Sequence, residues 1–293
     1  MNKLVIGTAQ FGMDYGINNE RGKIPREEIF QILNEAIKFG IGIVDTARCY
    51  GAAEKILGDF IRKTDADFKV ISKLPLCGYK EAGKQFALSL DRLNLSSLYG
   101  YLIHNFESYK KEPRIWGALE KLRDRKKVKK IGFSVYLPSE LEFILKGDLK
   151  IDIIQTPFSI FDQRFKAYFP ELKKREIEIY ARSVFLQGLV FKKSCELNGH
   201  FKIMKNKIDR LNKVARELGL PIAALCVNFA LLNELVDKVI VGIDRLENLV
   251  EIMRAVDTGT KIRGALDRLS EFREEDERII LPCNWDLEQS AAL

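Results

Sequence analysis

Four side chains of the kinds that move protons in enzymes follow short apolar runs of this sequence. One run ends in Asp45, with Tyr50 five residues later, and the next two runs lead into Lys73 and His104. A carboxylate at the end of a buried strand needs a polar partner, and Lys73 and His104 are the candidates. An acid, a phenol, an amine and an imidazole together suit general acid–base catalysis.

Each of the four also has an ordinary structural explanation when it is taken alone. An aspartate after a strand commonly caps a helix, a lysine at a strand end is commonly solvated, and a tyrosine or histidine commonly packs or satisfies a local hydrogen bond. Four such residues in this order favour a catalytic site instead. His200 is the other histidine of the chain, and its polar surroundings predict a surface loop.

The elements that would position these residues are short apolar runs, which predict strands, alternating with segments of helical periodicity. In the predicted helix 27–37, Ile29 and Leu33 fall on one face, with Pro25 near its start and Gly40 after its end. The predicted strands cover residues 3–7, 41–45, 68–73, 98–104, 129–134, 151–155, 176–181 and 238–242.

About eight alternations of strand and helix predict an α/β fold, specifically a (β/α)8 TIM barrel, rather than an open sheet. Active sites of such barrels lie at the carboxyl ends of the strands. Six predicted strands end there in a polar residue or a glycine: Asp45, Lys73, His104, Ser134, Gln155 and Gly242. Because no linker or repeat is visible, we expect a single domain over residues 1–293, with residues 259–293 as a C-terminal tail packing on the barrel.

Composition sets broad limits on partners and location. The chain has 293 residues, of which 46% are hydrophobic and 30% charged, with a formal net charge of +7 and a pI of about 9.0. The densest basic run, residues 123–130, falls where a helix should end, so it favours a solvated helix terminus over a nucleic-acid surface. No signal peptide or membrane span is apparent. We expect a cytoplasmic protein that binds neither nucleic acid nor membrane; the sequence does not predict an oligomeric state.

The five cysteines are scattered and lack the paired spacing of a metal site, so reduced thiols and no metal are predicted. Cys49 stands next to Tyr50. A nucleophilic role for it would require a histidine base, and His104 is better used elsewhere.

Several motifs together resemble the aldo-keto reductases over nearly the whole chain. They are the tetrad Asp45, Tyr50, Lys73 and His104 and the segments 6–12 (IGTAQFG), 45–47 (DTA), 50–51 (YG) and 54–58 (EKILG). The segments 7–16 and 179–189 are similar to those of a bacterial branch linked with surface-sugar biosynthesis.

The resemblance implies a role for each residue of the tetrad. Tyr50 would give a proton to the carbonyl oxygen, Lys73 would lower the pKa of that phenol, Asp45 would hold Lys73 charged, and neutral His104 would orient the carbonyl. No Gly-x-Gly-x-x-Gly follows the first strand, so a Rossmann fold is not supported.

The same resemblance implies a nicotinamide cofactor at the barrel mouth. Gly7 and Thr8 would lie beside the nicotinamide, and Ser134 and Gln155 would bind its carboxamide, with Val135 where the family usually has Asn. Further contacts are implied for Arg182 (in place of a stacking aromatic), Ser183, Phe185, Gln187, Gly242, Arg245 and Asn248. Family habit favours NADP(H) over NAD(H); Asp244 opposes this preference and Arg245 offsets it.

The leading hypothesis is therefore NAD(P)H-dependent reduction of an aldehyde or ketone, with a sugar-like carbonyl as one substrate class. The alternative is a cofactor-binding regulatory or scaffold subunit on the same barrel, with little turnover. Four aromatic residues are candidates for the walls of a substrate pocket, with the protein core as the competing location: Phe11, Phe106, Phe158 and Trp285.

Overall fold

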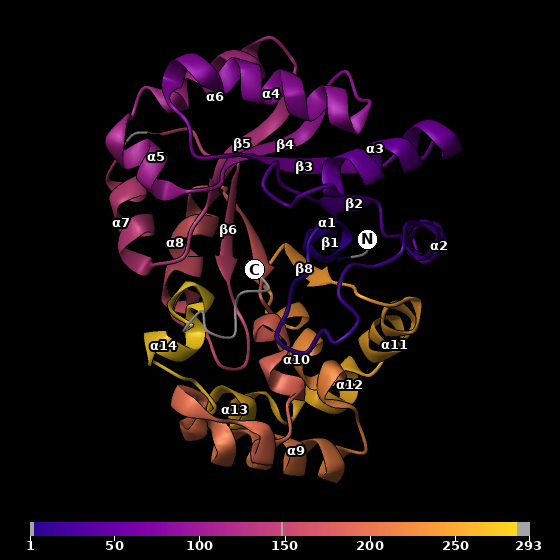
Figure 1. Ribbon diagram of the computed structural model, residues 1–293. Coiled ribbons are helices and arrows are strands. Elements are labelled where there is room, and N and C mark those ends of the chain that lie inside the picture. The colour runs from indigo at the N-terminus through magenta and orange to yellow at the C-terminus, as the bar shows by residue number, and fades with distance from the viewer. Residues whose placement is uncertain (1–2, 148, 286–293) are drawn as a thin grey trace.

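A computed structural model describes residues 3–147 and 149–285 and contains eight parallel strands that close into a barrel in sequence order (Figure 1). This arrangement confirms the predicted (β/α)8 barrel. The strands are β1 (Leu4–Gly7), β2 (Ile43–Asp45), β3 (Lys69–Leu74), β4 (Leu98–Ile103), β5 (Val128–Ser134), β6 (Ile153–Pro157), β7 (Glu178–Arg182) and β8 (Lys238–Gly242).

Closure of the barrel rests on the first strand, which pairs on both sides. Gly7 lies opposite Asp45 of β2 and also opposite Gly242 of β8. Seven strands contribute one buried apolar side chain each to a cluster inside the barrel: Val5, Ile43, Ile71, Leu102, Ile153, Tyr180 and Ile240. The interior is thus packed, as in other barrels of this class, and the strand ends are left to carry the site.

Helices surround the strands in Figure 1. They are α1 (Ala9–Gly12), α2 (Arg26–Lys38), α3 (Ala53–Thr64), α4 (Tyr79–Leu93), α5 (Phe106–Lys111), α6 (Ile115–Asp124), α7 (Pro138–Lys146), α8 (Phe169–Lys174), α9 (Lys205–Leu218), α10 (Ile222–Leu231), α11 (Leu246–Val256), α12 (Gly259–Arg263), α13 (Leu266–Ser270) and α14 (Glu277–Ile280). Helix α2 buries the predicted face, including Ile29 and Leu33. Its apolar face packs on the barrel, which is the main source of stability for a surface helix.

The clearest departure from the predicted strands concerns β6, which begins and ends two residues later than predicted. Its partner β7 continues the ladder, because Thr156 pairs with Ala181 and Pro157 with Arg182. Gln155 therefore lies within the strand and not at its end. A local apolar pattern does not predict such an extension, because the end of β6 depends on the length of the neighbouring strand β7.

The segment 259–285 packs against the barrel and its loops. The Gln163 side chain donates to the Ser270 carbonyl (3.0 Å), and the Glu274 N–H donates to the Phe161 carbonyl (2.8 Å). The ring of Trp285 meets Phe201 edge-on at 5.0 Å. Residues 286–293 of the predicted tail lie outside the described part of the chain, and the division into one domain over 1–293 stays a prediction.

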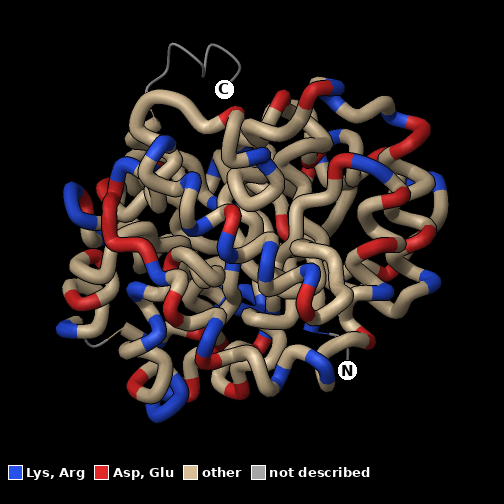
Figure 2. Tube along the Cα trace, turned by 90° about the horizontal axis from the view of Figure 1, so that it is seen from below, with Lys and Arg blue, Asp and Glu red and all other residues tan. Residues whose placement is uncertain are grey.

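Charged residues of both signs are interspersed along the trace in Figure 2. Some form ion pairs, such as Arg21 with Glu28 (2.9 Å) and Lys173 with Asp237 (2.8 Å). In residues 3–147 and 149–285, no single helix has the length and apolar composition to cross a bilayer, although the bent pair Gly199–Leu218 and Ile222–Leu231 meets both criteria jointly.

Candidate active site

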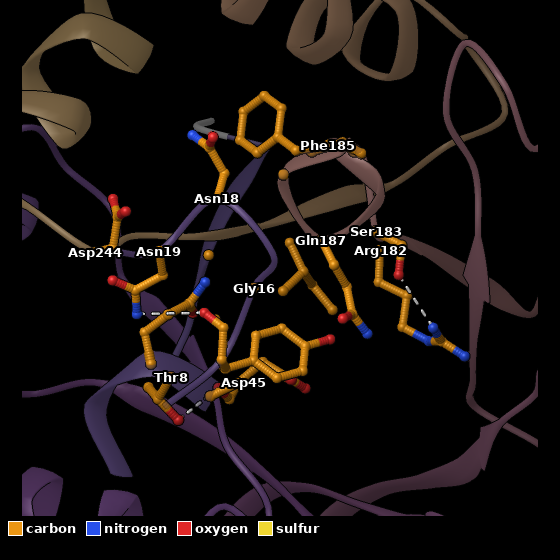
Figure 3. A pocket seen from close by; sticks show the side chains of 18 of the residues that line it. Thr8, Gly16, Asn18, Asn19, Asp45, Arg182, Ser183, Phe185, Gln187 and Asp244 are labelled. Atoms are coloured by element: carbon orange, nitrogen blue, oxygen red, sulfur yellow. Dashed lines mark hydrogen bonds between the residues drawn. The ribbon is translucent and has the colours of Figure 1, made fainter. Parts of the chain in front are cut away.

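A pocket of about 380 Å³ opens at the carboxyl ends of the strands (Figure 3). This volume is within the usual range for small-molecule sites. Its inner end, at the strand ends, contains Asp45, Tyr50 and His104. Its outer end is formed by loop residues and by the start of α11: Asn18, Asn19, Gln187, Asp244, Asn248 and Glu251.

A buried ion pair forms the floor of the inner end. The Lys73 ammonium lies 2.6 Å from Asp45 Oδ2 and also donates to the Thr46 carbonyl (2.9 Å). Lys73 is 1% exposed and Asp45 4% exposed. The second oxygen of Asp45, Oδ1, accepts a hydrogen bond from the Gln155 amide. A buried pair of this kind is tolerated because these further hydrogen bonds satisfy both charges.

Tyr50 lies directly over this pair. The Lys73 nitrogen is 5.0 Å from the centroid of the Tyr50 ring. Desolvation, and then the charge of Asp45, raise the pKa of Tyr50 well above its ordinary value, and Arg182 acts in the opposite direction. Burial thus outweighs the lowering of this pKa that was expected from Lys73.

His104 meets Tyr50 edge-on, with ring centroids 5.7 Å apart. Burial lowers the pKa of His104 to about 3, helped by the cations of Lys73 and Arg182. The imidazole is therefore neutral at physiological pH, as the proposed orienting role requires. Its Nδ1 lies 3.2 Å from Cys49 Sγ, a contact that the sequence did not predict.

The backbone around Tyr50 is held by a close approach of two chain segments. A side-chain Cβ on Gly12 of α1 would lie 1.9 Å from the Tyr50 carbonyl oxygen, and one on Gly51 would lie 2.4 Å from the Gly12 oxygen. Gly51 also has a φ of +54°, which favours glycine. The glycines of the predicted motifs thus let α1 fix the loop that carries the phenol.

Glu54, in the first turn of α3, also holds the loop that carries Tyr50. Its side chain is 1% exposed. It accepts a hydrogen bond from the Ser72 hydroxyl of β3 (2.7 Å), and its other oxygen is 3.9 Å from Arg48. Ser72 precedes Lys73, so this bond ties the tyrosine loop to the strand that carries the lysine.

Most of the predicted cofactor residues line the pocket: Gly7, Thr8, Ser134, Arg182, Ser183, Phe185, Gln187, Gly242 and Asn248. Two do not. Gln155 is fully buried beneath Asp45, because β6 continues beyond it. Arg245 is exposed at the N-terminus of α11, and its neighbour Asp244 faces the pocket instead.

Arg182 occupies the wall between the inner and outer ends. Its guanidinium stacks on the Tyr136 ring at 4.0 Å and donates to the Val135 carbonyl (2.9 Å) and the Ser183 hydroxyl (3.2 Å). The two residues that depart from the family pattern, Val135 and Arg182, are thus in direct contact. Tyr136 lines the pocket as well, and no sequence motif marks it.

Two loops meet across the outer end of the pocket. The Ile17 N–H donates to the Gln187 carbonyl (2.9 Å), and a Cβ on Gly188 would lie 2.8 Å from that of Asn18. Leu186 and Gln187 have positive φ angles of 45° and 51°, a strained conformation for residues other than glycine. Strain of this kind commonly accompanies ligand sites.

The pocket residues that the sequence analysis missed include Gln10, Tyr15, Gly16, Asn18, Asn19, Gly188, Phe191 and Glu251. The glycines of the two loops were the available signal, since they permit the close contact. The four aromatics considered as pocket walls do not line it. Each is buried in the core, where apolar rings are most stable: Phe11, Phe106, Phe158 and Trp285.

The lining suits a polar ligand that both donates and accepts hydrogen bonds. Three lining residues carry a buried polar atom with no hydrogen-bond partner in the described part of the chain: Gln10 Oε1, Arg182 Nε and Gln187 Oε1. Buried polar atoms are normally paired, so a bound molecule is expected to pair them. Within residues 3–147 and 149–285, no group of three or more His, Cys, Asp or Glu residues is arranged to hold a metal.

Comparison with known proteins identifies the family of the chain. A model of the Aldo/keto reductase family matches residues 3–267. The chain is 26% identical to the uncharacterized oxidoreductase YqkF of Bacillus subtilis (strain 168), over 94% of this chain and 98% of that protein. It is 24% identical to a D-threo-aldose 1-dehydrogenase of Pseudomonas sp over 84% and 89% of the two chains, and 22% identical to an L-galactose dehydrogenase of Arabidopsis thaliana over 80% of each.

The fold is also that of a solved structure, the holo form of an aldo-keto reductase from Bacillus halodurans. The TM-score is 0.77 at 19% identity, over 94% of this chain and 95% of the other. The resemblance identified in the sequence is thus confirmed by a match over most of the chain. The protein is an NAD(P)H-dependent oxidoreductase of carbonyl groups and belongs to the aldo/keto reductase family.

Proposed function

We propose that the protein reduces the carbonyl of a small aldehyde or ketone to an alcohol with Tyr50 as the proton donor. The observation that carries this assignment is the stacking of groups at the inner end. The Lys73–Asp45 pair lies beneath the Tyr50 ring, and the His104 ring meets its edge. Tyr50 and His104 both face the pocket, where a carbonyl oxygen can reach them.

When bound, the nicotinamide supplies a hydride to the carbonyl carbon. The protein must then protonate the oxygen as negative charge develops on it. Because burial raises the pKa of Tyr50, its phenol keeps its proton at neutral pH and is a donor. Proton transfer leaves a phenolate, which Lys73 beneath the ring and Arg182 across the pocket stabilise by their charges.

The other residues hold these groups in place. Asp45 keeps Lys73 charged in a site that would otherwise desolvate it, and Gln155 holds Asp45. Neutral His104 donates a hydrogen bond to the carbonyl oxygen and orients it. Ser134, at the end of β5 in the lining, is the side chain we assign to the carboxamide.

Replacement of Tyr50 by Phe tests the proton donor. We expect NADPH oxidation with a panel of aldehydes and ketones to fall by about 100- to 10,000-fold, the usual contribution of general acid catalysis. NADPH affinity, measured by fluorescence titration, should stay within about twofold because the ring remains. Tyr168→Phe, outside the pocket lining, is the matched control. Full activity of Tyr50→Phe would show that another group donates the proton.

Cofactor preference and substrate class follow from other observations. A preference for NADP(H) is favoured by family habit and by Arg245 at the N-terminus of α11, and it is opposed by Asp244 in the lining. We therefore expect a small preference. A sugar-like substrate is supported by the names of two relatives, an aldose and a galactose dehydrogenase. A cytoplasmic location and the lack of nucleic-acid and membrane partners stay predictions, and the alternative of a scaffold subunit has no observation in its favour.

A further inference from the structure

The thiol of Cys49 lies against the imidazole that faces the proposed substrate. Cys49 comes from the loop after β2 and His104 from the end of β4, yet Sγ and Nδ1 are 3.2 Å apart. This distance is within the range of a hydrogen bond to sulfur. The contact with Cys49 occupies Nδ1. The other ring nitrogen, Nε2, remains available to a ligand in the pocket that His104 lines.

The direction of this hydrogen bond follows from the chemistry of the two groups. Neutral imidazole has one N–H and one strongly accepting nitrogen, whereas a thiol sulfur is a weak acceptor. The ordinary pKa of a thiol lies above neutral pH, and partial burial raises the pKa of the Cys49 thiol further, so the sulfur of this otherwise exposed residue carries a proton to donate. Nδ1 as the acceptor of S–H is therefore favoured over Nδ1–H pointing at sulfur.

We propose that Cys49 is a positioning residue that selects the tautomer of His104, with Nδ1 unprotonated and the proton on Nε2. Only that tautomer presents an N–H to a carbonyl oxygen in the pocket. The other would present a lone pair to it and repel the oxygen. This inference rests on the proposed function for its purpose, although the tautomer itself is a property of the protein without substrate.

The small number of histidines makes a direct measurement practical. The chain has two, His104 and His200. In protein labelled with ¹⁵N-histidine, long-range ¹H–¹⁵N spectra distinguish a protonated from an unprotonated ring nitrogen. His200 lies outside the pocket lining, so His200→Gln removes its signals and leaves those of His104 for assignment.

We expect wild-type His104 to show a protonated Nε2 and an unprotonated Nδ1. Cys49→Ala should convert this spectrum to a mixture of tautomers, and Cys49→Ser, whose hydroxyl donates in the same place, should restore it. Carbonyl reduction should fall about threefold to tenfold in Cys49→Ala and recover in Cys49→Ser, because one modest hydrogen bond is lost and regained.

The spectra separate this inference from the proposed function. A protonated Nδ1 in the wild type, or an unchanged single tautomer in Cys49→Ala, would overturn the role of Cys49 whatever the activity. If the spectra behave as expected but no carbonyl is reduced, the proposed reaction is wrong and the tautomer assignment stands. Cys49 is exposed, so its replacement by Ala or Ser is expected to leave the fold intact.

Discussion

The two ends of the pocket are built differently. At the inner end, strand residues hold charged groups that are almost fully buried and hydrogen-bonded on both sides, as Lys73 and Asp45 show. At the outer end, loops and the first turn of α11 present half-buried polar groups. There the Asn248 amide donates to Asp244, and strained backbone at Gln187 meets the opposite loop.

We therefore expect the inner end to carry out proton transfer and the outer end to select the cofactor and the substrate. Groups on strand ends are fixed by the barrel, which suits proton transfer because its geometry has little tolerance. Groups on loops change at small cost to the fold, which suits the choice of cofactor and substrate. Replacements at the inner end should therefore affect stability and rate strongly, and those at the outer end should mainly affect affinity.

The largest effect is expected from Lys73→Met. It leaves the buried Asp45 carboxylate without its cation, so we expect the free energy of unfolding to fall by ~3–5 kcal/mol. Lys38→Met is the matched control, because its ammonium pairs with Glu35 on an exposed face and should contribute less than ~1 kcal/mol. Urea unfolding measures both. If the free energy of unfolding fell equally in the two variants, the buried Lys73–Asp45 pair would stabilise the protein no more than an exposed ion pair does.

An intermediate effect in mild acid, near pH 5, is expected from the protonation of His104. Its pKa of about 3 in the folded protein lies below the ordinary 6.5, so between these values the unfolded chain binds a proton that the folded protein excludes. The free energy of unfolding is therefore unaffected by the protonation of His104 above about pH 6.5. As the pH falls below this value, it decreases by up to ~1.4 kcal/mol per pH unit.

His104→Gln removes this pH dependence, so unfolding by urea at a series of pH values should show the wild type losing more stability in acid than the variant. His200→Gln, outside the pocket lining, serves as the control. Parallel curves for wild type and His104→Gln would show that the imidazole is protonated as easily in the fold as in water.

The smallest effect is expected at the outer end, from Asp244→Asn. Removing this carboxylate from the lining should raise the affinity for NADPH by about threefold to tenfold, since one partly solvated charge repels the 2′-phosphate. NADH affinity should change by less than about twofold. Glu247→Gln, exposed in the first turn of the helix that follows Asp244, is the matched control. Equal gains for the two cofactors would place the phosphate away from Asp244.

The sequence predicted the inner end more completely than the outer end. Asp45 and His104 follow strands whose local apolar pattern is strong, and parallel strands in a barrel bring their carboxyl ends together. Gln155 was misplaced because the length of β6 depends on pairing with β7. Whether Arg245 contacts the cofactor stays a prediction, since it lies exposed at the start of α11 while its neighbour Asp244 lines the pocket.

By itself, the sequence determined the barrel, the order of its strands and the residue types at their ends, since these depend on local periodicity and on right-handed βαβ connections. Only the tertiary structure decided which groups touch. The thiol of Cys49 meets His104, Arg182 stacks on Tyr136, and the loop with Ile17 meets Gln187. These contacts join segments far apart in the chain, so they arise only when the barrel has closed and no local pattern encodes them.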